Sequence, residues 1–246
     1  MSVRQPGRRY KAIFLDLFGT LVSHTSNEES HLRLMEDLVD RYNITTEPPV
    51  LLKRFNDLLQ APYMGTDTTW VPHRELVVRA LDEMLKDHGL VATAEAEGQF
   101  YERYLSKHRG FVRLLPGARE AVESLQATRL LIGAVADCDR DYLDQQLRWL
   151  EITELFDSQT TAEEAGARKP DGKLFLAALE KAHCRPEQAV FAGDSVERDI
   201  RGAKALGMTT VLLDARMVYT ELEEADFVAS HLSRMATILM ELAYSP

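Results

Sequence analysis

The chain has 246 residues, of which 45% are hydrophobic, and this is enough for one large domain or two small ones with buried cores. Its 29 lysines and arginines face 39 aspartates and glutamates, so the formal net charge is −10. That charge argues against non-specific binding to nucleic acid or to an anionic membrane. An anionic ligand must therefore be attracted by local positive charges.

The composition also bears on the cellular compartment. No apolar stretch approaches the roughly 18 residues that a membrane helix needs, and the basic start of the chain leads into a strand that Asp16 interrupts. The two cysteines, Cys138 and Cys184, lack Cys-x-x-Cys spacing and are too few for a disulfide framework. These features predict a cytoplasmic protein without nucleic-acid or membrane partners.

The first predicted strand ends on a single carboxylate. Residues 11–21 read KAIFLDLFGTL, and the apolar run stops at Asp16, which Gly19 and Thr20 soon follow. A carboxylate at the end of a buried parallel strand is costly to desolvate unless a ligand uses it. Asp16 is therefore a candidate to meet a metal ion or an electrophile.

Residues 23–110 carry helical patterns and no strand pattern. Ser26 and Glu29 form a capping box, and prolines open two further helices at 48 and 72. Gly89 is expected to end the third helix as a left-handed cap, and a fourth helix is expected near 94–108. Four helices inserted into an α/β chain predict a helical cap domain at 23–110, and 1–22 with 111–246 would form the core domain.

Beyond residue 115 strands alternate with helices. This alternation predicts an α/β fold, a three-layer Rossmann-like sandwich whose parallel sheet is covered on both faces and binds ligands at the carboxyl ends of its strands. The expected strands cover 129–135, 155–160, 189–192, 209–213 and 226–228, and the expected helices cover 117–127, 139–150, 172–183, 196–206 and a closing segment from about 232.

Three later motifs follow the Asp16 segment in a fixed order. They are LLIGAVADCD at 130–139, GARKPDGKLF at 166–175 with Lys169, and AVFAGDSVERDIRGAKALGM at 189–208. Together the four segments resemble the haloacid dehalogenase (HAD) superfamily of hydrolases. With FDSQTTAEEAG at 156–166, the whole chain is most similar to an archaeal-type branch of probable haloacid dehalogenase-like proteins.

The resemblance implies a Mg²⁺ site at the carboxyl ends of the strands. Asp194 would share the ion with Asp16, and the backbone carbonyl of Phe18 would be the third protein ligand. Waters held by Ser195 or Asp199 would complete an octahedral oxygen shell. From the residues alone, Asp194 also fits a helix N-terminal cap, and Asp199 also fits a solvated helix face.

The resemblance further implies covalent catalysis. The residue at the position of Asp16 attacks phosphorus or a halogen-bearing carbon, and water later hydrolyses the ester. Because a carboxylate repels an anionic substrate, nearby cations must compensate, and Lys169 would supply one. Thr20 would direct its hydroxyl to the nucleophile or the phosphate. From the residues alone, Lys169 also fits a surface lysine before a turn. Thr20 also fits a residue that only stabilises the turn after Asp16.

Two positions depart from the family pattern. Phe18 stands where the phosphatases carry a second acid, the general acid and base that typically contributes ~10²–10⁴-fold in rate. Ala136 stands where the family usually offers a hydroxyl to the substrate, a loss of ~1–3 kcal/mol unless a backbone N–H or Asp137 compensates. Ala136, Asp137 and Arg140 are the expected substrate-binding residues, although Arg140 also fits a solvent-exposed position.

Three functions stay open at this point. The first is a Mg²⁺-dependent phosphatase that forms an aspartyl-phosphate on Asp16 from a small organic phosphate. The second is a 2-haloacid dehalogenase, which needs no proton donor at Phe18 but generally lacks the acid at the position of Asp194. The third is a non-catalytic binding protein with the same fold. That third protein would bind a metabolite or a partner without turnover. The expected substrate of the enzyme is a small anionic molecule, and the expected state is a monomer or homodimer.

Overall fold

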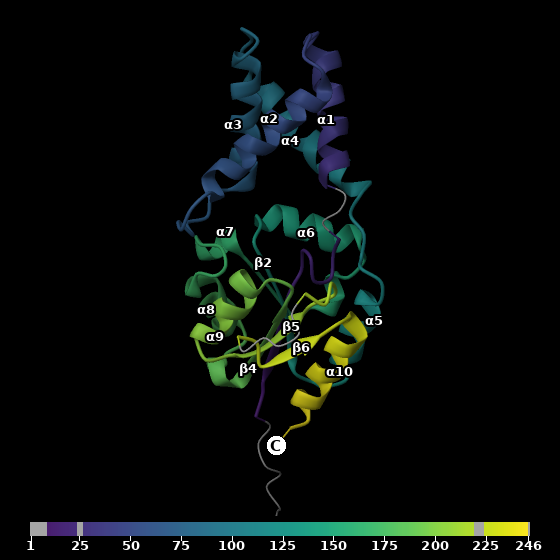
Figure 1. Cartoon of the computed structure of the whole chain (residues 1–246), viewed down its shortest axis with the longest axis vertical. Helices are drawn as coiled ribbons and strands as arrows, with labels where there is room; N and C mark the ends of the chain where they lie inside the picture. The colour runs from purple at the N-terminus through teal and green to yellow at the C-terminus, as the bar shows by residue number, and fades with distance from the viewer. Residues whose placement is uncertain (1–8, 24–26, 219–223, 246) are drawn as a thin grey trace, which may run out of the picture. The chain divides into compact units, whose positions relative to one another are not determined.

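The computed structural model describes residues 9–23, 27–218 and 224–245 (Figure 1). The described residues fall into two compact units, one within Met1–Ser23 and Leu114–Pro246 and the other within His24–Arg113. We propose that the first unit is the α/β core domain and that the second is the cap domain.

The first unit is built on a six-stranded sheet with the strand order β3-β2-β1-β4-β5-β6. Every neighbouring pair of strands is parallel. The strands are β1 (Ala12–Asp16), β2 (Leu131–Ala136), β3 (Ser158–Thr161), β4 (Ala189–Gly193), β5 (Thr209–Leu213) and β6 (Phe227–Ala229). The strand order reverses at β1, between β2 and β4, which is where open parallel sheets bind their ligands.

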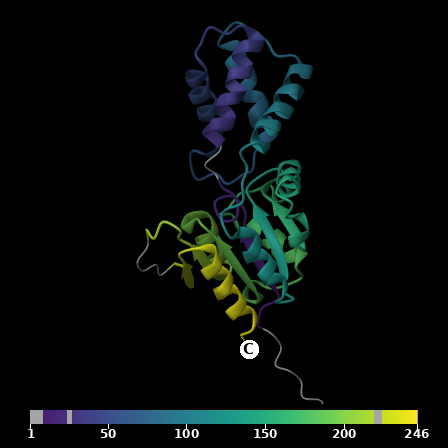
Figure 2. The same ribbon diagram turned by 90° about the vertical axis from the view of Figure 1, so that its right-hand side faces the viewer.

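Helices cover both faces of this sheet, which confirms the predicted fold class. Helix α5 packs on α10, and α8 packs on α9, and these two pairs lie on opposite sides of the sheet (Figures 1 and 2). The helices are α5 (Ala118–Gln126), α6 (Arg140–Trp149), α7 (Ala162–Ala165), α8 (Gly172–Lys181), α9 (Arg201–Ala205) and α10 (Leu232–Ala243), with 3₁₀ turns η2 (Thr153–Leu155) and η3 (Pro186–Gln188).

The central strands are apolar because both of their faces are covered. All five residues of β1 and all five of β4 are buried. Phe14 fills the space above its partner in β2, Gly133, where a Cβ atom would lie only 2.6 Å from the Phe14 ring. Packing of this kind fixes the position of β1, and with it the position of Asp16 at its carboxyl end.

The predicted helix at 196–206 is wrong as a single regular α-helix. Its first turn is a π-helical turn, η4 (Val196–Ile200), and α9 follows it. The Ser195 carbonyl accepts hydrogen bonds from the N–H groups of both Asp199 and Ile200, at 2.9 and 3.2 Å. The wider turn directs the Asp199 carboxylate back toward the end of β4. Single π turns of this type occur frequently at functional sites.

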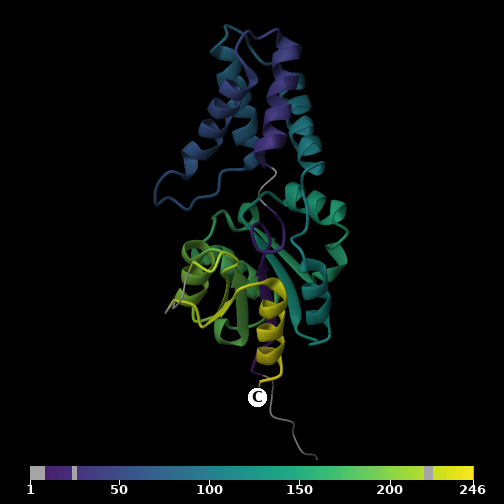
Figure 3. The same ribbon diagram turned by 45° about the vertical axis from the view of Figure 1, so that its right-hand side comes forward.

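The second unit is a bundle of helices (Figure 3). Its described elements are α1 (Asn27–Tyr42), α2 (Pro48–Gln60), the 3₁₀ turn η1 (Ala61–Tyr63), α3 (His73–Lys86) and α4 (Ala94–Arg109). Helix α1 packs on α2 and α4, and α3 completes the bundle by packing on α2 and α4. The capping residue Ser26 lies outside the described residues. Gly89 has φ +71°, and its N–H bonds to the carbonyl of Lys86, the last residue of α3.

No helix among the described residues combines the length and the apolar character that a membrane span requires.

Candidate active site

The carboxyl ends of β1 and β4 bring two aspartates together. Asp16 is the last residue of β1, and Asp194 directly follows β4, the neighbouring strand. Gly19 allows this approach, because it has φ +98° and a Cβ atom there would lie 2.4 Å from Asp194 Oδ2. A glycine in the loop after β1 therefore makes room for the carboxylate after β4.

Lys169 links Asp16 to a third aspartate. Its ammonium donates hydrogen bonds to Asp16 Oδ1 and, at 2.7 Å, to Asp199 Oδ1. The side chain is only 1% exposed, so Lys169 is not a surface lysine. Burial lowers the pKa of Lys169, but Asp16 and Asp199 outweigh burial, and the net effect is a raised pKa. Lys169 is therefore a buried cation.

The other oxygen of Asp16 also has a donor. The Thr20 hydroxyl donates a hydrogen bond to Asp16 Oδ2 at 2.7 Å, and Thr20 is fully buried. With Lys169 on Oδ1, the Asp16 carboxylate is fixed in orientation from both sides. A carboxylate held in this way can face an electrophile without losing rotational freedom on binding.

Asp199 is fully buried, so it does not lie on a solvated helix face. The Ser195 N–H donates to Asp199 Oδ2 at 3.0 Å. Gly193 makes room for the carboxylate, because a Cβ atom there would lie 2.4 Å from Asp199 Cγ. Burial raises the pKa of Asp199, and Lys169 partly offsets this rise.

These three aspartates form a cluster of oxygen atoms that suits a divalent cation. One carboxylate oxygen from each of Asp16, Asp194 and Asp199 lies within 4.8 Å of the others. Hard cations such as Mg²⁺ prefer oxygen ligands, and each carboxylate oxygen has lone pairs beyond those used by its hydrogen-bond donors. The donor set therefore fits Mg²⁺.

The Phe18 side chain contacts the ring of Tyr142, with 5.8 Å between the ring centroids.

The family model of haloacid dehalogenase-like hydrolases matches residues 44–213, which is more than half of the chain. The chain belongs to this family. The expectation that it is an enzyme, a hydrolase of the HAD superfamily, is thereby confirmed.

Relatives within the HAD family carry different activities in their names. The chain is 28% identical to a glyceraldehyde 3-phosphate phosphatase of Pyrococcus furiosus over 94% of each chain. Its fold matches a HAD phosphatase from Thermococcus onnurineus, with a TM-score of 0.70, 23% identity and coverage of 93% of this chain and 97% of that one. It also matches a 2-haloacid dehalogenase from Pseudomonas syringae, with a TM-score of 0.74, 22% identity and coverage of 94% and 99%. The fold alone therefore does not separate the two chemistries.

The three residues expected to bind substrate in this HAD hydrolase have different surroundings. Ala136 is fully buried at the end of β2. Asp137 Oδ1 accepts a hydrogen bond from the Lys169 backbone N–H at 2.9 Å, so Asp137 positions the loop that carries the buried cation. Arg140 binds Glu164, Gln159 and Asp144 instead. This separate network does not support a substrate-binding role for Arg140.

Sequence reasoning missed one charged residue of the HAD site, Arg198. It lies within the GDSVERD motif, between Glu197 and Asp199, and its guanidinium is 3.9 Å from Asp137 Oδ2. The only signal in the sequence was its place next to Asp199.

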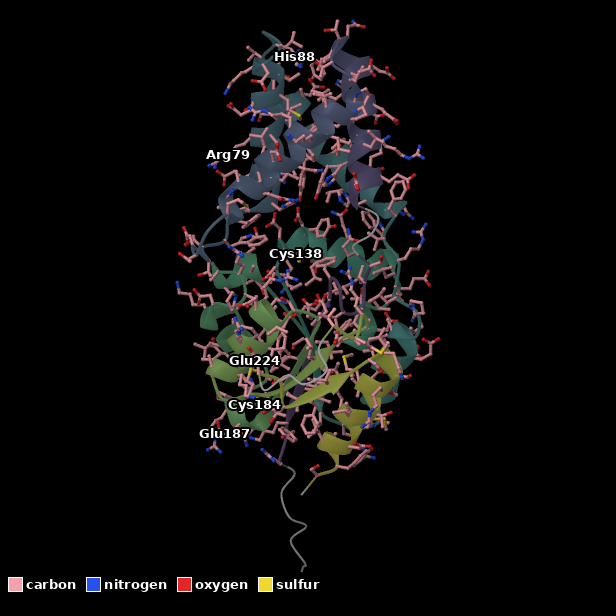
Figure 4. All side chains as sticks on the ribbon, in the orientation of Figure 1. Arg79, His88, Cys138, Cys184, Glu187 and Glu224 are labelled. Carbon is pink, nitrogen blue, oxygen red and sulfur yellow. The ribbon has the colours of Figure 1, made fainter. Side chains whose placement is uncertain are left out.

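Cys138 is buried near the same end of the sheet (Figure 4), and burial raises the pKa of its thiol well above the usual range, which fits a packing role.

Proposed function

We propose that this HAD hydrolase is a Mg²⁺-dependent phosphatase that acts on a small organic phosphate. The observation that carries the proposal is the cluster of Asp16, Asp194 and Asp199, two of which, Asp16 and Asp199, pair with the buried ammonium of Lys169. Haloacid dehalogenases generally lack an acid at the position of Asp194 and need no metal. The Asp194 carboxylate beside the proposed nucleophile is therefore better explained by a bound cation.

In this proposal, Asp16 is the nucleophile, and it forms an aspartyl-phosphate that water hydrolyses. The Thr20 hydroxyl and the Lys169 ammonium hold its two oxygens in place. Bound by Asp16, Asp194, Asp199 and the Phe18 carbonyl, Mg²⁺ would supply positive charge against the phosphate dianion. Lys169 supplies a second positive charge in a buried setting, where electrostatic interactions are stronger than in water.

Phe18 restricts the substrate class. Because this side chain cannot donate a proton, the leaving group must depart without protonation from this position. Acyl, enol and aryl phosphates meet that condition better than alkyl phosphates. The Pyrococcus furiosus relative, named a glyceraldehyde 3-phosphate phosphatase, supports a small phosphorylated substrate. Glyceraldehyde 3-phosphate is an alkyl phosphate, so the preference for acyl, enol and aryl esters rests on Phe18 alone. We keep the expectation of a cytoplasmic location, which the two free cysteines support.

The test is release of inorganic phosphate from a panel of aryl and alkyl phosphates, with and without Mg²⁺. We expect Mg²⁺-dependent release, fastest from aryl and acyl phosphates, and its loss in Asp16→Asn. A matched control is Asp157→Asn, which removes a carboxylate bonded to the Ile132 N–H at the start of β2, away from the cluster. If no phosphate ester is hydrolysed in the presence of Mg²⁺, the proposal is wrong.

One observation favours a second candidate, a 2-haloacid dehalogenase. Phe18 is apolar, and halide departs without a proton, so this position suits dehalogenation equally well. The same Asp16 carboxylate would displace the halide and form an ester. Chloride release from 2-chloropropionate, unaffected by EDTA, would support the dehalogenase and contradict the phosphatase.

A further inference from the structure

Arg198 is a positively charged residue of the site whose guanidinium is only weakly paired with other residues. Among the residues that the structure describes, its guanidinium makes no hydrogen bond, and the nearest carboxylate oxygen, Asp137 Oδ2, is 3.9 Å away. Only the backbone N–H of Arg198 is bonded, to Ser195 Oγ at 3.2 Å. The guanidinium therefore keeps its donors available for a ligand.

The surroundings of Arg198 are accessible and strongly acidic. Its side chain is 40% exposed and lines an open cavity of about 360 Å³ together with Asp194 and Ser195. The guanidinium, which stays charged at any ordinary pH, therefore lines the same cavity as the proposed metal ligand Asp194.

Lys169 supplies positive charge, but only one of its three ammonium N–H donors remains for a ligand. It is 1% exposed, and its ammonium is already bonded to Asp16 and Asp199. Ala136, in turn, offers no hydroxyl where the family usually has one. A tetrahedral anion entering this site would need donors from elsewhere, and a planar guanidinium can give two parallel hydrogen bonds to such an anion.

We propose that Arg198 binds the phosphate group of the substrate, and so takes over the contact that Ala136 cannot make. This assignment rests on the proposed phosphatase function, because a phosphate oxyanion is the ligand that its free donors and its place beside Asp194 fit. Arg198 is then a substrate-binding residue supplied by the η4 turn after β4, whereas Ala136 lies on β2.

The test measures binding of inorganic phosphate by calorimetry in the presence of Mg²⁺, so that no turnover is needed. Arg198→Gln should weaken phosphate binding by about 10- to 100-fold, the value of hydrogen bonds to a charged group. Arg198→Lys keeps the charge but loses the paired donors. Its phosphate affinity should lie between those of Arg198→Gln and the wild type. The matched control is Arg201→Gln. Arg201 lines the same cavity, but Glu197 and Glu224 already occupy its guanidinium, so phosphate affinity should stay unchanged.

The outcomes separate this assignment from its alternatives. If Arg198 only balances the acidic charge, Arg198→Gln will change the Mg²⁺ affinity and leave the phosphate affinity intact, which overturns the assignment. Absence of phosphate binding by the wild-type protein overturns it as well. If Arg198→Gln does not fold, Arg198→Lys decides by the same criterion. Phosphate binding that depends on Arg198, without hydrolysis of any ester, would support this assignment and contradict the proposed function.

Discussion

At the residue scale, Gly19 is the position at which backbone conformation and chemistry are most closely coupled. It has φ +98°, and any side chain there would meet the carboxylate of Asp194. Gly117 offers a matched comparison, because its φ is +82° and no atom lies within 4 Å of the place of its Cβ atom. Both substitutions to alanine carry backbone strain of about 1–2 kcal/mol, and only the one at Gly19 disturbs the proposed metal site.

We therefore expect Gly19→Ala and Gly117→Ala to lower the free energy of unfolding, and only Gly19→Ala to weaken Mg²⁺ binding, by tenfold or more. Denaturant unfolding and Mg²⁺ titration of both variants measure the two effects. Equal Mg²⁺ affinities in the two variants would show that the contact with Asp194 does not matter.

Phe18 carries a second prediction at this scale. Phe18→Asp places a carboxyl group where the family's phosphatases hold their general acid, so hydrolysis of alkyl phosphates should rise, by at least about tenfold. Aryl phosphates, which leave without protonation, should gain much less. Phe18→Leu is the control that removes the ring without adding an acid. A rise in Phe18→Leu, or none in Phe18→Asp, would show that the missing acid does not limit the rate.

At the element scale, the helical unit contains buried histidines between its helices. His108 on α4 is 1% exposed, donates from Nδ1 to the Tyr104 carbonyl at 2.8 Å and lies against His31 of α1, with 5.1 Å between the rings. Burial, more than any other cause, lowers the pKa of His108 to about 3, and His31 and His73 lower it further against the Tyr104 hydrogen bond. Burial also lowers the pKa of His31.

This burial makes stability depend on pH. The pKa of His108 falls from 6.5 in the unfolded chain to about 3 in the folded one. Its contribution is therefore fully present above about pH 6.5 and is lost as the pH falls toward 3. At about pH 5 the loss is ~2 kcal/mol. Denaturant unfolding between about pH 7.5 and pH 5 should show a shallower slope in His108→Leu than in the wild type. Equal slopes would contradict the prediction.

The elements differ in how well the sequence predicted them. The strands and most helices were predictable because their apolar residues recur at spacings set by burial, as in β1 and in the buried face of α3. The π turn η4 was not, because it depends on the tertiary contact between Asp199 and the Ser195 N–H. The four-residue helix α7 is too short to show a period, although its Thr161 and Glu164 form a capping box.

At the scale of the whole molecule, the candidate site joins segments that are distant in the sequence. Asp16 and Lys169 are separated by 153 positions, and the family resemblance alone suggested that they meet. Asp16 and Lys169 could be predicted as site residues because each lies at a recognisable strand end or turn. The Arg140 network and the weak pairing of the Arg198 guanidinium with Asp137 could not be predicted, because they depend on which of several nearby acids each arginine reaches.

The central claim is that Asp16 at the end of β1 and Asp194 after β4 hold one divalent cation between them. Calorimetric titration with Mg²⁺ tests it most directly, in the wild type, in Asp194→Asn and in Glu197→Gln, whose carboxylate pairs with Arg201 outside the cluster. We predict one bound ion per chain in the wild type and in Glu197→Gln, and an affinity at least about tenfold weaker in Asp194→Asn. Mg²⁺ binding that is absent from the wild type, or that is unchanged in Asp194→Asn, would contradict the claim.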